Sequence, residues 1–252
     1  MASTTVPPAE VPESVSSISR IFGALFSPKA TFESVVRRPT WLVPLLVATL
    51  ISICGGIVAG HRLDWRTVVE QQIQKRPSAQ RRIEQLPPEQ REQALTQQAK
   101  IIPITVYAAS VVGPAIIIVV VAAVYLGVFN LVRGVPMKFS TSMSIMAYAW
   151  MPQVINGLLA ILILCLKDPA TIDVQNIVAS NAAVFLSDGA AQWLSTLLGA
   201  IDIFSIWVMV LMSIGYSAVN PKKLTFGKAF GTVVGVWLIL LLMRVGLAAA
   251  FS

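Results

Sequence analysis

Five long apolar stretches, separated by polar segments, dominate the sequence. A helix needs about 20 mostly apolar residues to cross the roughly 30 Å of hydrocarbon in a bilayer, and each stretch is long enough. Pro103 and Pro114 are expected to mark the start of the second helix and a bend within it. The pattern predicts an all-α polytopic membrane protein with five transmembrane helices plus interfacial amphipathic helices. The spans are expected at about 41–60, 105–130, 143–166, 192–218 and 229–251.

Two short amphipathic helices are predicted before the first span, in an arm formed by residues 1–38. Ser27-Pro28 separates them, because serine caps helices and proline suits the first helical position. Their apolar faces, next to basic residues, are typical of helices that lie in the membrane interface. Packing of the same faces on the protein's own bundle is the alternative. The expected interfacial anchors, here and at the span ends, are Phe22, Phe26, Phe32, Trp41 and Trp193.

The rest of the chain, 39–252, is expected to form one membrane domain. Its hydrophilic segment 61–100 is predicted to fold as three short helices, at about 64–76, 78–86 and 88–100, over one end of the bundle. Prolines divide this segment and favour those boundaries. The connection 167–191 has a helix-like spacing of apolar residues, which predicts a further helix lying on the surface.

Composition and charge support a membrane protein and indicate its orientation. Hydrophobic residues make up 56% of the chain and charged residues 12%, about half the charge of a soluble domain, which excludes a water-soluble globular enzyme. The loops 133–140 and 219–228 carry five basic residues and no acidic one. Basic loops stay in the cytoplasm. The N-terminus is therefore expected inside and the C-terminus outside, in the plasma (inner) membrane if the source is bacterial.

Two ionisable residues, Asp202 and Arg244, lie inside the predicted spans. Each is 21 residues from Lys223, the centre of the turn expected between the last two helices. In a helical hairpin they would lie at the same depth, so a neutralising ion pair is the simplest interpretation of two charges that are costly in lipid. Snorkelling of Arg244 toward the outer surface and proton or ion coupling by Asp202 are the alternatives.

Amides form a second polar group in the spans. Gln153 and Asn156 lie three residues apart on one face of the third helix, directly after Pro152 and close to Tyr148. Amides at this spacing can form hydrogen bonds between helices or satisfy the carbonyl that proline leaves free. We favour this structural role over a substrate path. Gly231 and Gly235 form a GxxxG pattern, a common signal of helix packing.

Motifs for catalysis or metal binding are absent from the sequence. It has one histidine, His61, at the end of the first span, and it lacks HExxH, GxSxG, P-loop and CxxC patterns. Cys54 and Cys165 lie in apolar runs and form neither a disulfide framework nor a zinc site. We therefore expect no enzyme activity, no cofactor and no metal. The excess of basic residues is assigned to orientation and lipid contact and not to nucleic-acid binding.

Four stretches, in order, resemble the Yip family of five-span membrane proteins in its bacterial form. They are FSPKATFE at 26–33 with the following Arg38-Pro39-Thr40-Trp41, the stretch 137–155 with Tyr148 and Pro152, IDIFSIWVMVLMSIGYSAV at 201–219, and KAFGTVVGVW at 228–237. The resemblance implies a cytosolic N-terminus, five helices and an outward C-terminus. Eukaryotic members act with Rab-type GTPases, but their cytosolic motif has no match in residues 1–38, so binding to such a GTPase is not carried over.

Two functional hypotheses follow. The first is a non-enzymatic scaffold that organises a membrane region or recruits partners; its expected contacts are the lipid bilayer and membrane-protein partners or further copies of the chain. The second is a small permease or channel with a polar path near Asp202, Gln153 and Asn156.

Overall fold

The computed structural model describes residues 16–250 except 76, 175 and 187–188. Residues 1–15 of the predicted arm and the last two residues, 251–252, lie outside the described part. Within that part the regular elements are helices, and the extended backbone is limited to one antiparallel bridge between Asn181 and Asp202. The predicted all-α class is confirmed.

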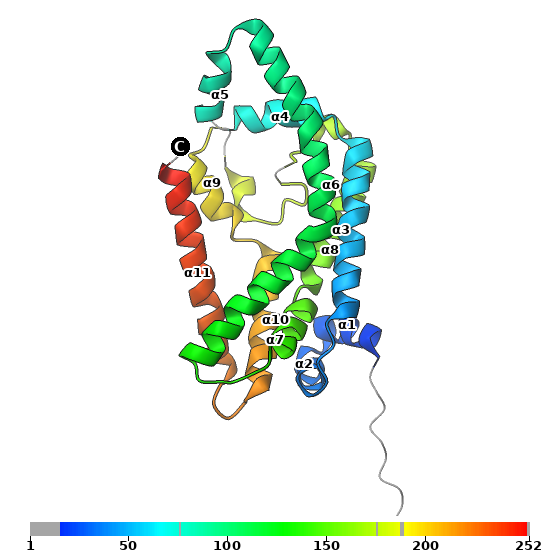
Figure 1. Ribbon diagram of the computed structural model, residues 1–252, viewed down its shortest axis with the longest axis vertical. Coiled ribbons are helices and arrows are strands. Elements are labelled where there is room, and N and C mark those ends of the chain that lie inside the picture. Colours follow the sequence, from blue (N-terminus) through cyan, green and yellow to red (C-terminus); the bar gives the residue numbers. More distant parts are fainter. Residues whose placement is uncertain (1–15, 76, 175, 187–188, 251–252) are drawn as a thin grey trace, which may run out of the picture.

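In the described part of the chain, four helical segments are long and apolar enough to cross a membrane. They match four of the five predicted spans. The segments are α3 (Leu42–Arg62), α6 (Pro88–Gly127) with its π-helical continuation (Val128–Val132), α7 (Phe139–Ala149) joined to α8 (Met151–Leu166), and α11 (Phe226–Ala250). Of these, α3 and α11 run along the long axis of the molecule, and α6 bends across it (Figure 1).

The fourth predicted span, at 192–218, is not one continuous helix. It consists of α9 (Gln192–Gly199) and α10 (Ile203–Val219), which follow one another along the molecule (Figure 1). Residue Asp202 has extended backbone and caps α10 with its side chain. Backbone hydrogen bonds from Ala182 to Ile201 and from Ile203 to Ser180 hold the chain extended there. The expectation of five continuous spans is corrected by this break.

Helices are present in the hydrophilic segment as predicted, but the third of them is the start of a longer helix and not a separate one. The first two are α4 (Trp65–Gln74) and α5 (Pro77–Glu84), and the third predicted helix continues without interruption into α6. Pro103, predicted to start the second span, lies inside α6 together with Pro114. An internal proline removes one backbone hydrogen bond and bends a helix without always ending it, and α6 bends part-way along its length (Figure 1).

The predicted surface helix at 167–191 is wrong. The described residues of this connection form two short 3₁₀ turns, Pro169–Thr171 and Ala182–Phe185, and no α-helix. The Asn181 side chain bonds to the Asn176 side chain and to the Ala183 backbone N–H, and such local bonds compete with helix formation. Ile172 is buried against α3, α4 and α8, so the apolar residues of this connection fill a small core of their own.

The main core lies at the end of the molecule that holds α1 (Ser17–Phe26) and α2 (Pro28–Arg37) (Figure 1). The Phe129 and Tyr216 rings stack there with centroids 4.4 Å apart, and the Tyr216 hydroxyl is 2.8 Å from the Ser142 hydroxyl. Helix α7 is buried from Thr141 to Ala149. α7 is therefore the central element, and α1 and α2 close the bundle around it.

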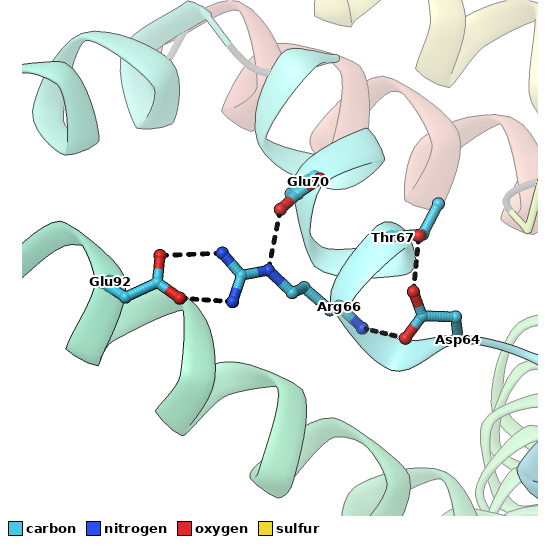
Figure 2. A network of polar contacts seen from close by, with 5 residues as sticks. All are labelled: Asp64, Arg66, Thr67, Glu70 and Glu92. Carbon is cyan, nitrogen blue, oxygen red and sulfur yellow. Dashed lines mark hydrogen bonds and ion pairs between the residues drawn. The ribbon is translucent and has the colours of Figure 1, made fainter.

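At the opposite end, Arg66 joins α4 to the polar start of α6 (Figure 2). Its guanidinium binds both oxygens of Glu92 and one oxygen of Glu70. The hydrogen bond to Glu92 is the main cause of a raised pKa for Arg66. Asp64 caps α4, and its bonds to the Thr67 hydroxyl and the Arg66 N–H lower its pKa. These contacts hold the two ends of the hydrophilic segment together, α4 against the start of α6.

Candidate functional site

The break between α9 and α10 holds a buried carboxylate. Asp202 is 8% exposed, and one of its oxygens accepts a hydrogen bond of 2.8 Å from the Ser205 backbone N–H. The Ser180 hydroxyl donates to the other oxygen. A carboxylate at a helix N-terminus is stabilised by the unpaired N–H groups and the helix dipole. Asp202 therefore has local partners for its charge that require no basic side chain.

Gln153 and Asn156 are connected to this carboxylate through Ser205, whose backbone N–H bonds to Asp202 and whose hydroxyl bonds to Gln153. The Gln153 amide donates to the Ser205 hydroxyl over 3.4 Å, and the Asn156 amide donates to the Gln153 carbonyl oxygen over 3.2 Å. The carbonyl oxygen of Asn156 is buried and has no partner among the described residues. This chain of contacts thus links α8 to the first turn of α10, and it joins three residues that the sequence analysis singled out separately.

Pro152 and Tyr148 have other surroundings. Pro152 is buried in the first turn of α8, directly before Gln153, where its missing N–H is not needed. The Tyr148 hydroxyl is 3.2 Å from the Thr40 hydroxyl. Arg20 donates to that Thr40 oxygen and to the Arg38 carbonyl, each over 3.0 Å. Tyr148 therefore belongs to a network that ties α1 and the start of α3 to α7, away from the Asp202 chain.

Asp202 and Arg244 are not joined in the structure. The ion pairs in the described part of the chain are Arg66–Glu70, Arg66–Glu92 and Lys75–Asp173. The Asp202 oxygens accept hydrogen bonds from the Ser180 hydroxyl and the Ser205 backbone N–H. Arg244 is exposed and lines a cavity that Asp202 does not line. The predicted pairing assumed an unbroken helical hairpin, and the break at 200–202 removes that premise.

The predicted interfacial anchors divide into two groups. Phe22 and Phe26 are 61% and 80% exposed on α1, and Trp41 and Trp193 are also exposed. Phe32, in contrast, is completely buried, because α2 packs on α7 and α10. Phe32 is therefore a core residue and not a lipid anchor. The sequence left open whether these helices lie in the membrane interface or pack on the bundle. Helix α2 packs on the bundle, whereas the apolar face of α1 is not covered by protein in the described part of the chain.

Three residues of these networks were not found by sequence reasoning. Ser205 had a signal, since an aspartate directly before an apolar run is a typical helix cap for the residue three positions later. Ser180 had none, because its segment was expected to be helical. Arg62, at the end of α3, donates to the carbonyls of Leu164, Cys165 and Lys167 and so caps α8. Groups of three or more side chains suited to a metal ion are absent from the described residues.

Comparison with known proteins identifies the family. The Yip1 domain profile matches residues 22–247, which is most of the chain. The chain belongs to the Yip1 domain family. It is similar to the membrane protein YknW of Bacillus subtilis (strain 168), with 26% identity over 203 residues that cover 77% of this chain and 76% of that protein. No solved structure matches the chain significantly.

The family assignment confirms the resemblance drawn from the sequence and the multi-pass membrane character of the chain. The Yip1 match begins in α1 and ends in α11. It includes the residues around Asp202 and, in the other network, Arg38, Thr40 and Tyr148, whereas Arg20 lies just before the matched region.

Proposed function

We propose that this Yip1-family protein is a non-enzymatic scaffold that organises a membrane region or recruits partners, with its N-terminus in the cytoplasm and its C-terminus outside. The observation that carries the proposal is the uncovered apolar face of α1. Ile18, Phe22 and Phe26 are each more than 60% exposed, although they lie on a helix whose other side is anchored in the bundle.

The anchoring of α1 makes this face a fixed surface. Arg20 and Ala24, on the opposite side of the helix, are buried, and the Arg20 bonds to Arg38 and Thr40 hold α1 to the start of α3. Full burial of an aromatic or aliphatic side chain of this size contributes about 1.5–3 kcal/mol. Three such side chains on one rigid helix are enough to hold α1 in a bilayer interface or against a partner.

The location of this face can be measured by spin labelling in bilayers. In a background with Cys54 and Cys165 replaced by serine, nitroxides are placed by Phe22→Cys and Phe26→Cys. The control is Gln93→Cys, at an exposed polar position in the hydrophilic start of α6. We expect the labels at 22 and 26 to be accessible to oxygen and shielded from a water-soluble relaxation agent, and the label at 93 to be accessible to that agent. Equal access to the water-soluble agent at all three positions would remove the basis of the proposal.

A small permease is a second candidate, and the polar chain from Asp202 to Asn156 favours it. Discontinuous helices with polar groups at the break are the usual binding elements of secondary transporters. The test is labelling of Gln153→Cys and Asn156→Cys by a membrane-impermeant maleimide. Labelling at both positions from one side would support a water-filled path. Protection of both positions from both sides would exclude one.

A further inference from the structure

A polar cavity is lined by residues of α9 and α11, by Lys75 at the end of α4, and by described residues between Asp173 and Leu186 together with Gly189 and Ala190. These elements lie at the end of the molecule that holds the C-terminus (Figure 1). The cavity volume is about 520 Å³, within the range of small-molecule sites in proteins. The walls include Lys75 from α4, Arg244 from α11, and Gln192 and Ser195 from α9. We propose that this cavity binds a phosphate-bearing anion, with Arg244 as its principal cationic contact.

The charges on the described walls are unequal. Lys75, Asp173 and Arg244 are the ionisable residues that line the cavity. The Lys75 ammonium and the Asp173 carboxylate form an ion pair of 2.6 Å, which neutralises both. Arg244 forms no ion pair with a described carboxylate, so among the described walls its positive charge is the one without a counter-charge.

The position of Arg244 in an apolar helix strengthens this interpretation. Its neighbours Leu240, Leu242, Met243 and Leu247 are exposed apolar residues of α11, as expected of a surface in lipid. A charge among such residues is costly and usually faces a water-filled cavity or a partner of opposite sign. Guanidinium binds phosphate through two parallel N–H groups, a geometry that ammonium lacks. An anion in the cavity would therefore offset the cost of placing arginine here.

Uncharged donors complete the site. Ser195 and Gln192 of α9 line the cavity. Asn181 lines it too, and its side-chain amide donates to Asn176. Hydroxyl and amide groups that line the same cavity as an arginine are the donors that a tetrahedral oxyanion requires. The proposal does not depend on the scaffold role, because α1 lies at the other end of the molecule.

Phosphate can come from an anionic phospholipid headgroup or from a soluble ion, and the experiment separates the two. The full chain is purified in dodecyl maltoside, a detergent without phosphate, and its melting temperature is measured after addition of phosphatidylglycerol to the micelles or of inorganic phosphate to the buffer. Variants are Arg244→Gln, Arg244→Lys and Ser195→Phe, which fills the cavity from its wall. Arg81→Gln, an exposed basic residue outside the cavity, is the matched control.

We expect a saturable rise in the melting temperature of the wild type. The apparent affinity should fall at least tenfold in Arg244→Gln and Ser195→Phe, less in Arg244→Lys, and remain unchanged in Arg81→Gln. A response to phosphatidylglycerol alone assigns the site to a lipid headgroup, and a response to both additives assigns it to phosphate in general. No response to either additive, or equal responses in wild type and the cavity variants, would overturn the proposal.

Discussion

Replacement of Phe32 by alanine tests the packing of α2 most sharply, because Phe26 on the neighbouring helix offers a matched control. Phe32 is completely buried, whereas Phe26 is 80% exposed. Truncation of a buried phenylalanine costs about 3–5 kcal/mol through lost transfer free energy and the cavity that remains. A substitution on an uncovered surface usually changes stability by less than about 0.5 kcal/mol. Phe32→Ala should therefore be the more destabilising variant by several kcal/mol.

The contact between Phe32 and α10 supplies a second, independent perturbation. A Cβ atom on Gly215 would lie 2.9 Å from the Phe32 ring and 2.5 Å from the Ile145 side chain. Overpacking of this kind costs about 1–3 kcal/mol. Because Gly215 and Phe32 are in contact, the combination of Gly215→Ala with Phe32→Ala should cost less than the sum of the two single changes.

The assay is equilibrium unfolding in mixed detergent micelles, which gives the free energy of unfolding for each variant. Similar losses for Phe32→Ala and Phe26→Ala would refute the reasoning, since they would place both rings in the same environment. Strict additivity of Phe32→Ala and Gly215→Ala would show that α2 does not pack on α10 as described here.

Three further predictions concern the other contacts between helices. Gly56 faces α6 so closely that a Cβ would lie 2.8 Å from the Ser110 hydroxyl, whereas Gly231 on α11 has open space around it. Gly56→Leu should therefore abolish the yield of folded protein and Gly231→Leu should preserve it, as measured by size-exclusion chromatography. Asp202→Ala should lower the free energy of unfolding by about 0.5–2 kcal/mol because α10 loses its cap. In a double-mutant cycle, the effects of Asp202→Ala and Arg244→Gln should add within about 0.5 kcal/mol. A coupling energy above about 1 kcal/mol, the scale of a net hydrogen bond, would show that the two charges interact. Arg62→Gln should lower stability by about 1–2 kcal/mol because the last carbonyls of α8 lose a charged donor, and an unchanged melting temperature would contradict that capping role.

Most of the fold was predicted from the length of the apolar stretches. The prediction of one continuous helix at 192–218 was wrong for a physical reason. Long apolar runs have few stable arrangements in lipid other than helices, so α3, the apolar part of α6, and α11 could be predicted from the sequence. The 192–218 run is equally apolar. Its break depends on backbone pairing with Ser180 and Ala182, residues far away in the sequence, and a single apolar run carries no signal of such a partner.

The orientation of amphipathic helices was open for a different reason. An apolar face looks the same in sequence whether lipid or protein covers it, so the stripe of α1 and the stripe of α2 were indistinguishable. Only the tertiary structure shows that Phe32 enters the core and Phe22 does not. In the same way, helical spacing placed Gln153 and Asn156 on one face, but their connection to Asp202 through Ser205 required the positions of α8 and α10.

Site-specific photocrosslinking from α1 in native membranes tests the scaffold role most directly. A benzophenone amino acid is introduced at Phe22, at Phe26 and, as the control, at Gln93, an exposed polar residue in the hydrophilic start of α6. The account predicts discrete lipid or protein adducts from positions 22 and 26 and none of them from position 93. The absence of adducts from 22 and 26, or the same adducts from all three positions, would contradict the claim that the apolar face of α1 is the protein's contact surface.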